Sequence, residues 1–235
     1  MHKIELDPAL VERLTVERGG RLHVFDDFDP ARTAHLVIDL QNGFMEPGAP
    51  VEVPLAKAIV PNVNTISEAI RKAGGTNIFV RFTTPSETLD GWSSFYKRFP
   101  KEVRQAHQAA FAPGAHYWQL WDELDVRADD LAVDKQRFSA FIPDTCNLHE
   151  ILQARGIDTL LITGTLTNCC CESTARDAMQ LNYRIIFASD ANATLTDAEH
   201  NATLNNMCAL FCDVMSTEEI LEALERKAPA AVAAE

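Results

Sequence analysis

Short runs rich in β-branched residues alternate along the chain with longer amphipathic stretches, and this alternation restricts the possible fold more than any other feature. The pattern is typical of βαβ units, in which successive strands lie parallel and helices cover both faces of the sheet. We therefore predict a three-layer, doubly wound α/β fold with a six-stranded parallel sheet. The predicted strands are His35–Asp39, Asn77–Phe82, Leu131–Asp134, Thr159–Thr163, Arg184–Ser189 and Cys212–Met215.

Helices are predicted between these strands, and glycines mark the ends of two of them. The predicted helices are Ile59–Ala73, Asn147–Arg155, Cys169–Leu181, Ala198–Leu210 and Glu218–Lys227. We expect one domain over residues 34–227, preceded by an N-terminal extension (1–33) without clear periodicity and followed by a flexible tail (228–235). Residues 83–126 are predicted to form a long irregular insert, rich in aromatic side chains, at the ligand-binding edge.

Composition narrows the class of partner. The formal charge of −13, from 21 Lys and Arg against 34 Asp and Glu, argues against a surface for nucleic acid or anionic lipid. No apolar run approaches the roughly 20 residues that span a bilayer, and the N-terminus has no apolar signal region. Six cysteines are too few for a disulfide scaffold in a chain of 235 residues. We predict a cytoplasmic protein with reduced thiols that acts on a small molecule.

Three side chains carry the predicted chemistry, and each stands at the carboxyl end of a predicted strand or just after one. Asp39 and Lys135 end strands, and Cys170 follows the strand and turn DTLLITGTLTN. Alone, Asp39 could be a turn residue and Lys135 a solvated strand end. A helix N-terminus lowers a thiol pKa from about 8.5, so Cys170 is the predicted nucleophile, whereas Cys169 and Cys171 are expected to be structural. Asp39, Lys135 and Cys170 together supply an acid/base, a cation and a thiol for covalent amide hydrolysis at the carboxyl edge of the sheet.

Four motifs, in order along the chain, resemble the isochorismatase-like cysteine hydrolase superfamily. They are VIDLQNGF, DKQRFSAF, LLITGTLTNCCCESTARDA and NYRIIFASDANAT. The resemblance implies a sheet of order 3-2-1-4-5-6, a catalytic Asp39, a catalytic Lys135 and a nucleophilic Cys170. It also implies an oxyanion hole formed by the backbone N–H groups of Leu166 and Cys170, with a cis peptide bond between Thr165 and Leu166.

The motif versions resemble the branch that includes ureidoacrylate amidohydrolases and streptothricin hydrolases. The metal-binding D-x-H-x…H segment of the nicotinamidase branch is replaced here by TTPSETLDGW. The resemblance therefore implies a homo-oligomeric amidohydrolase, a dimer or tetramer, without metal or cofactor, that cleaves a linear amide, ureido or carbamoyl C–N bond through a thioester. The alternatives are a vinyl ether hydrolase of the isochorismatase type and a non-catalytic binding protein. A redox protein is least favoured, because neighbouring thiols on a helix cannot close an unstrained disulfide.

Substrate contacts are less well defined by the sequence, because core packing explains an aromatic residue equally well. The predicted substrate-binding residues are Gln41, Trp92, Tyr96 and Phe138. Arg81 and Arg137 are candidate carboxylate anchors, since guanidinium binds that group with two hydrogen bonds. His107 and His116 lack metal-ligand spacing and are expected at the rim of the site.

Overall fold

The computed structural model describes residues 1–227, so the predicted tail lies outside the described residues. One six-stranded sheet forms the centre, with every strand pair parallel and the order β3-β2-β1-β4-β5-β6. The predicted fold class and strand order are confirmed. The strands are β1 (Thr33–Ile38), β2 (Thr76–Phe82), β3 (Leu131–Lys135), β4 (Thr159–Thr165), β5 (Arg184–Ala193) and β6 (Asp213–Met215).

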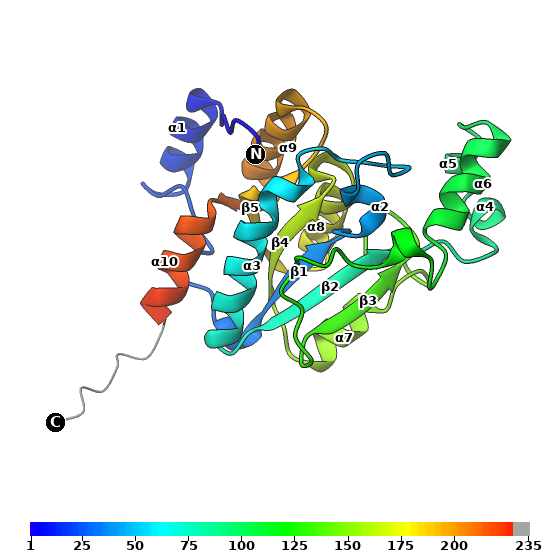
Figure 1. Ribbon diagram of the computed structural model, residues 1–235. Helices are drawn as coiled ribbons and strands as arrows, with labels where there is room; N and C mark the ends of the chain where they lie inside the picture. The colour runs from blue at the N-terminus through cyan, green and yellow to red at the C-terminus, as the bar shows by residue number, and fades with distance from the viewer. Residues whose placement is uncertain (228–235) are drawn as a thin grey trace.

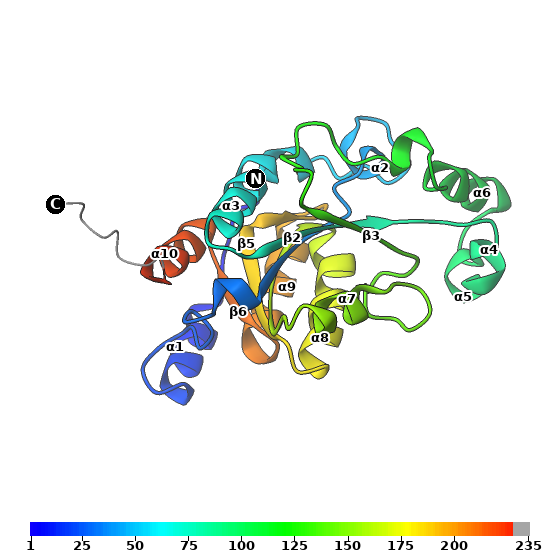
Figure 2. The same ribbon diagram turned by 90° about the horizontal axis from the view of Figure 1, so that it is seen from below.

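Helices cover both faces of the sheet (Figures 1 and 2). Successive strand residues point to opposite faces, so Val37 of β1 packs under α3 (Ala56–Lys72) and α10 (Thr217–Lys227), whereas Leu36 faces the other layer. That layer comprises α7 (Leu148–Ala154), α8 (Glu172–Gln180) and α9 (Asp197–Leu210). Within residues 1–227, no helix has the length and apolarity needed to cross a membrane.

The N-terminal 33 residues pack onto the domain through helix α1 (Pro8–Glu17) and the short turn η1 (Pro30–Arg32). Asp213 of β6 is buried and accepts hydrogen bonds of 2.6 Å from the backbone N–H groups of Val24 and Phe25. Arg18 donates to the Cys208 carbonyl oxygen of α9 at 2.7 Å. Apolar packing also holds this segment, because Leu6, Leu10 and Leu14, which recur every four residues, contact the core cluster.

The insert between β2 and β3 consists of short helices joined by irregular segments, and the prediction of a wholly irregular insert missed these helices. It contains α4 (Thr88–Gly91), α5 (Ser93–Tyr96), α6 (Lys101–Ala110) and the turn η2 (His116–Trp118). Val103, Ala106 and Ala110 of α6 recur at helical spacing, so the period was present in the sequence and was missed. These helices lie to one side of the sheet, beyond the end of β2 (Figure 1).

A buried polar cluster lies in the middle of the sheet around His35 of β1, whose side chain is inaccessible to solvent. Its Nε2 lies 2.8 Å from Thr163 Oγ1, and its Nδ1 lies 3.2 Å from both Asn77 Oδ1 and Ser67 Oγ. Burial lowers the pKa of His35 from 6.5 to about 3, because the charged ring would lose its hydration. The folded protein therefore holds this histidine neutral at neutral pH.

Acid is expected to destabilise the fold through this histidine. Because the pKa of His35 is lower in the folded protein, the unfolded chain binds a proton there first as the pH falls. The contribution of neutral His35 to the free energy of unfolding is therefore complete above pH 6.5 and is lost as the pH falls toward about 3. The loss for His35 is about 1.4 kcal/mol per pH unit within that window. Urea unfolding at several pH values measures the slope, which should be shallower in His35→Gln. His116→Gln is the control, because it removes a histidine at an exposed position. Equal slopes in His35→Gln and the wild type would contradict the assignment of the pH dependence to His35.

Candidate active site

The carboxyl edge of the sheet holds a buried ion pair between Asp39, which directly follows β1, and Lys135, the last residue of β3. Lys135 Nζ donates to Asp39 Oδ2 at 2.8 Å, and neither side chain is accessible to solvent. Lys135 also donates to the Arg137 carbonyl oxygen at 3.1 Å. Asp39 has a φ of 55°, a left-handed conformation that is uncommon for residues other than glycine. Lys135 is therefore not a solvated strand end, and Asp39 is not an exposed turn residue.

Burial and pairing set the protonation of the two groups. Burial raises the pKa of Asp39, whereas the Lys135 charge and the nearby Cys170 thiol oppose that rise. Burial alone would lower the pKa of Lys135, but the Asp39 carboxylate and Cys170 bring it above its ordinary value of 10.5. Lys135 is therefore charged, and Asp39 is a stronger base than an exposed carboxylate. Within the described part of the chain, Asp39 Oδ1 has no hydrogen-bond partner, so one oxygen is available to take a proton.

Cys170 lies in a π-helical turn, η3 (Thr167–Cys171), that leads directly into α8. Its side chain is buried, and a hydrogen bond with Cys169, burial and the Asp39 carboxylate raise the pKa of the thiol well above its ordinary value. The expectation that the helix N-terminus lowers this pKa was wrong, because burial beside a carboxylate outweighs the helix dipole. The resting nucleophile is thus a neutral thiol that needs a base.

The turn before Cys170 approaches β1 closely. The Thr165–Leu166 peptide bond is cis, and Gly164 has a φ of 123°. A side chain at Gly164 would collide with the backbone of Ile38, so glycine is required for β4 to bring this turn against β1. The Leu166 carbonyl oxygen accepts hydrogen bonds from the backbone N–H groups of Cys169 (3.1 Å) and Cys171 (3.2 Å). The oxyanion-hole role of the Leu166 and Cys170 N–H groups stays a prediction.

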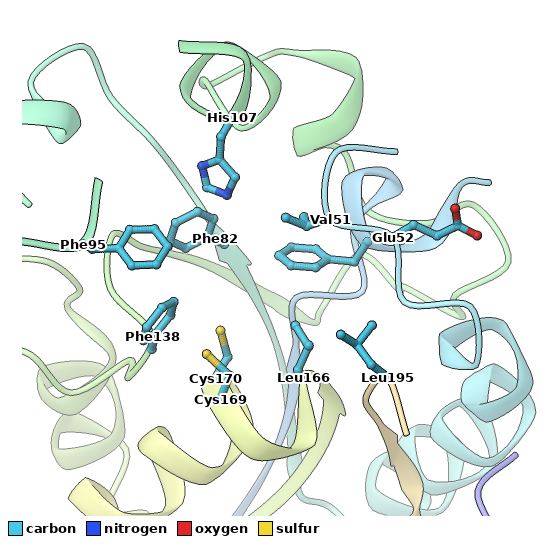
Figure 3. A pocket seen from close by; sticks show the side chains of 11 residues that line it. Val51, Glu52, Phe82, Phe95, His107, Phe138, Leu166, Cys169, Cys170 and Leu195 are labelled. Atoms are coloured by element: carbon cyan, nitrogen blue, oxygen red, sulfur yellow. The ribbon is translucent and has the colours of Figure 1, made fainter. Parts of the chain in front are cut away.

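A cavity of about 220 Å³ opens above the thiols of Cys169 and Cys170 (Figure 3). His107 of α6 extends into it from the opposite side, and burial lowers the pKa of His107 to about 4, so the ring is neutral. The carboxylate of Glu52 points away from the cavity and accepts a hydrogen bond of 2.7 Å from the Gly48 N–H. The lining residues are Phe44, Val51, Glu52, Phe82, Phe95, His107, Phe138, Leu166, Cys169, Cys170 and Leu195.

Gln41 does not line this cavity, and its predicted role in substrate binding was wrong. Its side-chain nitrogen donates to the carbonyl oxygens of Phe82 (3.0 Å) and Trp118 (2.9 Å). Its side-chain oxygen accepts from the Phe82 N–H at 2.7 Å. The amide is fully engaged with the backbone and joins the end of β1 to β2 and the insert.

Among the predicted aromatic contacts, only Phe138 lies on the wall of the Cys170 cavity. Trp92 instead stacks on Phe95 with ring centroids 4.5 Å apart and meets the Phe138 ring edge at 4.8 Å. Tyr96 is buried, and its hydroxyl lies 3.1 Å from Nδ1 of His107. Trp92 and Tyr96 therefore contact residues that face the cavity, and Tyr96 also lines a second cavity of about 440 Å³. Their role in substrate binding stays a prediction.

The two candidate carboxylate anchors also lie elsewhere. Arg81 pairs with Asp134 at 2.8 Å and stacks on the Trp118 ring. Arg137 donates to backbone carbonyl oxygens and stacks on Trp92. Neither lines the cavity.

Sequence reasoning missed several wall residues. Phe82 ends β2, and Leu195 lies just beyond the end of β5. Their position at the carboxyl edge of the sheet was the available signal.

The fold brings Asp39, Lys135 and Cys170 together at the carboxyl edge of the sheet. The isochorismatase domain family matches residues 33–219, and the chain belongs to the isochorismatase family. The uncharacterized isochorismatase family protein YwoC of Bacillus subtilis is 32% identical over 198 residues, covering 83% of this chain and 96% of YwoC. The ureidoacrylate amidohydrolase RutB of Klebsiella pneumoniae is 32% identical over 222 residues, covering 88% of this chain and 93% of RutB.

Among solved structures, a cysteine hydrolase from Pseudomonas syringae pv. phaseolicola superposes with a TM-score of 0.75 at 29% identity. The similarity covers 85% of this chain and 95% of that protein. The fold that carries the cluster is therefore the fold of the family.

Proposed function

We propose that this protein is a cysteine-dependent amidohydrolase that cleaves a linear amide, ureido or carbamoyl C–N bond of a small molecule through a thioester. The observation that carries the proposal is the buried Asp39–Lys135 pair beside the Cys170 thiol, with Asp39 Oδ1 left without a partner. The similarity to RutB supports a C–N bond as the target.

In the first half of the reaction, Asp39 accepts the thiol proton and Lys135 stabilises the resulting negative charge. The Cys170 sulfur attacks the substrate carbonyl, and its oxygen becomes an oxyanion. The N–H groups of Leu166 and Cys170 donate hydrogen bonds to this oxyanion. In other enzymes, removing one such donor raises the activation free energy by several kcal/mol. The oxyanion then collapses, the C–N bond breaks, and protonated Asp39 gives its proton to the departing nitrogen.

In the second half, Asp39 takes a proton from water, and the hydroxide attacks the thioester carbonyl. The same two N–H groups bind the second oxyanion. The C–S bond breaks, Cys170 recovers its proton from Asp39, and the acid leaves. One carboxyl group thus serves as base and acid in both halves.

A screen of small amides, ureas and carbamoyl compounds with ammonia detection tests this proposal, with isochorismate included and Cys170→Ala as the blank. Release of ammonia by the wild type alone is the expected result. Hydrolysis of isochorismate without cleavage of any amide would favour the vinyl ether alternative. Binding without turnover would favour a non-catalytic protein.

Activity is expected to survive removal of metal ions, because the chain itself supplies the acid, the base and the cation. In residues 1–227, no group of three or more His, Cys, Asp or Glu side chains is arranged to hold a metal ion. Prolonged dialysis against a chelator should leave kcat/KM unchanged, and elemental analysis should find less than stoichiometric zinc. Activity that is lost on chelation and restored by a divalent ion would contradict this expectation.

A further inference from the structure

We propose that the Cys170 cavity selects amides whose acyl group is uncharged and apolar, and that it rejects amides whose acyl group carries a carboxylate. This inference rests on the proposed function and specifies its substrate class. It follows from the chemistry of the cavity wall, from the charges around it and from its size.

The wall is formed almost entirely by carbon atoms of apolar side chains. Phenylalanines from four separate segments enclose it, and Leu166 and Leu195 close the side nearest β5 (Figure 3). The phenylalanines are Phe44, Phe82, Phe95 and Phe138. Apolar surface of this kind gains about 25 cal/mol per Å² when an apolar group displaces water from it. The acyl group attached to the attacked carbonyl meets this wall first, because both thiols lie at its base.

No lysine or arginine lines the cavity within the part of the chain that the structure describes. Lys135 is buried and already paired with Asp39. His107 is neutral, since its pKa is lowered to about 4, and Glu52 is acidic and turned away. A substrate carboxylate would therefore lose its hydration in the cavity without gaining a cation, which costs several kcal/mol.

The size of the cavity suits one ring or a short aliphatic chain. Its volume of about 220 Å³ exceeds that of the cavity of about 150 Å³ that binds benzene in an engineered protein. A second cavity of about 440 Å³ adjoins it and shares Val51, Phe95 and His107 as lining residues. Arg104 lies in that second cavity only, so a cation is present beyond the shared wall and not beside the thiol.

Kinetics with matched substrates test the proposal. Hexanamide and butanamide have uncharged acyl groups, and adipamate and succinamate have acyl groups of the same two lengths that end in a carboxylate. We expect kcat/KM for the uncharged pair to be at least about 100-fold higher, as a burial cost of about 3 kcal/mol implies. Preference for the acids would overturn the inference and leave the hydrolase proposal intact. No turnover of either pair or of any compound in the broader screen would instead overturn the proposed function itself.

A variant that adds a cation gives a second test. Leu195 is 53% exposed at the rim of the cavity, so Leu195→Lys should place an ammonium group there without opening the core. The ratio of kcat/KM for acids over uncharged amides should rise by about tenfold or more, the equivalent of about 1.4 kcal/mol. Leu210→Lys is the matched control, because Leu210 is 74% exposed and lies outside the cavity. Equal ratios in the two variants, with native thermal melts, would show that the acyl group does not occupy this cavity.

Discussion

Cys170→Ala is expected to abolish turnover, and an electrophile small enough to enter the cavity, such as iodoacetamide, is expected to label Cys170 before any other thiol. The reason is position: Cys170 lines the cavity beside Asp39, which takes the thiol proton as the reagent reacts, so the raised pKa of the resting thiol does not prevent labelling. Activity assays on the variant and mass-spectrometric mapping of the labelled peptide measure the two effects.

The neighbouring cysteines supply matched controls for this prediction. Cys169 lines the same cavity, so Cys169→Ala is the demanding control and should retain much of the activity. Cys171 is buried in the hydrophobic core against α8 and α9, so Cys171→Ala tests whether loss of a thiol disturbs folding. Labelling of Cys169 together with an active Cys170→Ala variant would move the nucleophile by one residue and refute the mechanism.

Asp39→Asn and Lys135→Ala are each expected to lower kcat by several orders of magnitude. The double variant should be no slower than the slower single variant, because the two groups act as one unit and their effects do not add. Steady-state kinetics on an amide found in the screen measure the three rates. Near-native kcat in a folded single variant would rule out the proposed roles.

Stability must be separated from chemistry in this series, because the pair is completely buried. Removing one partner leaves an uncompensated charge, which costs about 3–5 kcal/mol. Asp39→Asn combined with Lys135→Met removes both charges, so its melting temperature should rise above that of either single variant while kcat stays low. Recovery of activity along with stability would mean that the pair only holds the fold.

The arrangement of the sheet was predictable from the sequence because strand and helix periods are local properties. Adjacent strand residues such as Leu36 and Val37 point to opposite faces of the sheet. Both must be apolar when helices cover both faces, and both are buried here. The placement of Asp39 and Lys135 followed from the same logic, since residues that end parallel strands meet at one edge. The order of the strands came from the resemblance of the four motifs to the family, because periodicity alone does not give a strand order.

The tertiary structure alone decided which side chains are free to act. Gln41 stands next to the catalytic strand end in the sequence, yet three backbone contacts from distant segments occupy its amide. Cys170 begins a helix, yet burial beside Asp39 reverses the expected shift of its pKa. The sequence by itself determined the layered fold and the position of Asp39, Lys135 and Cys170 at one edge of the sheet, because these depend on residue type and spacing. The cavity wall and the protonation states depend on contacts between residues far apart in the chain, so only the folded structure decided them.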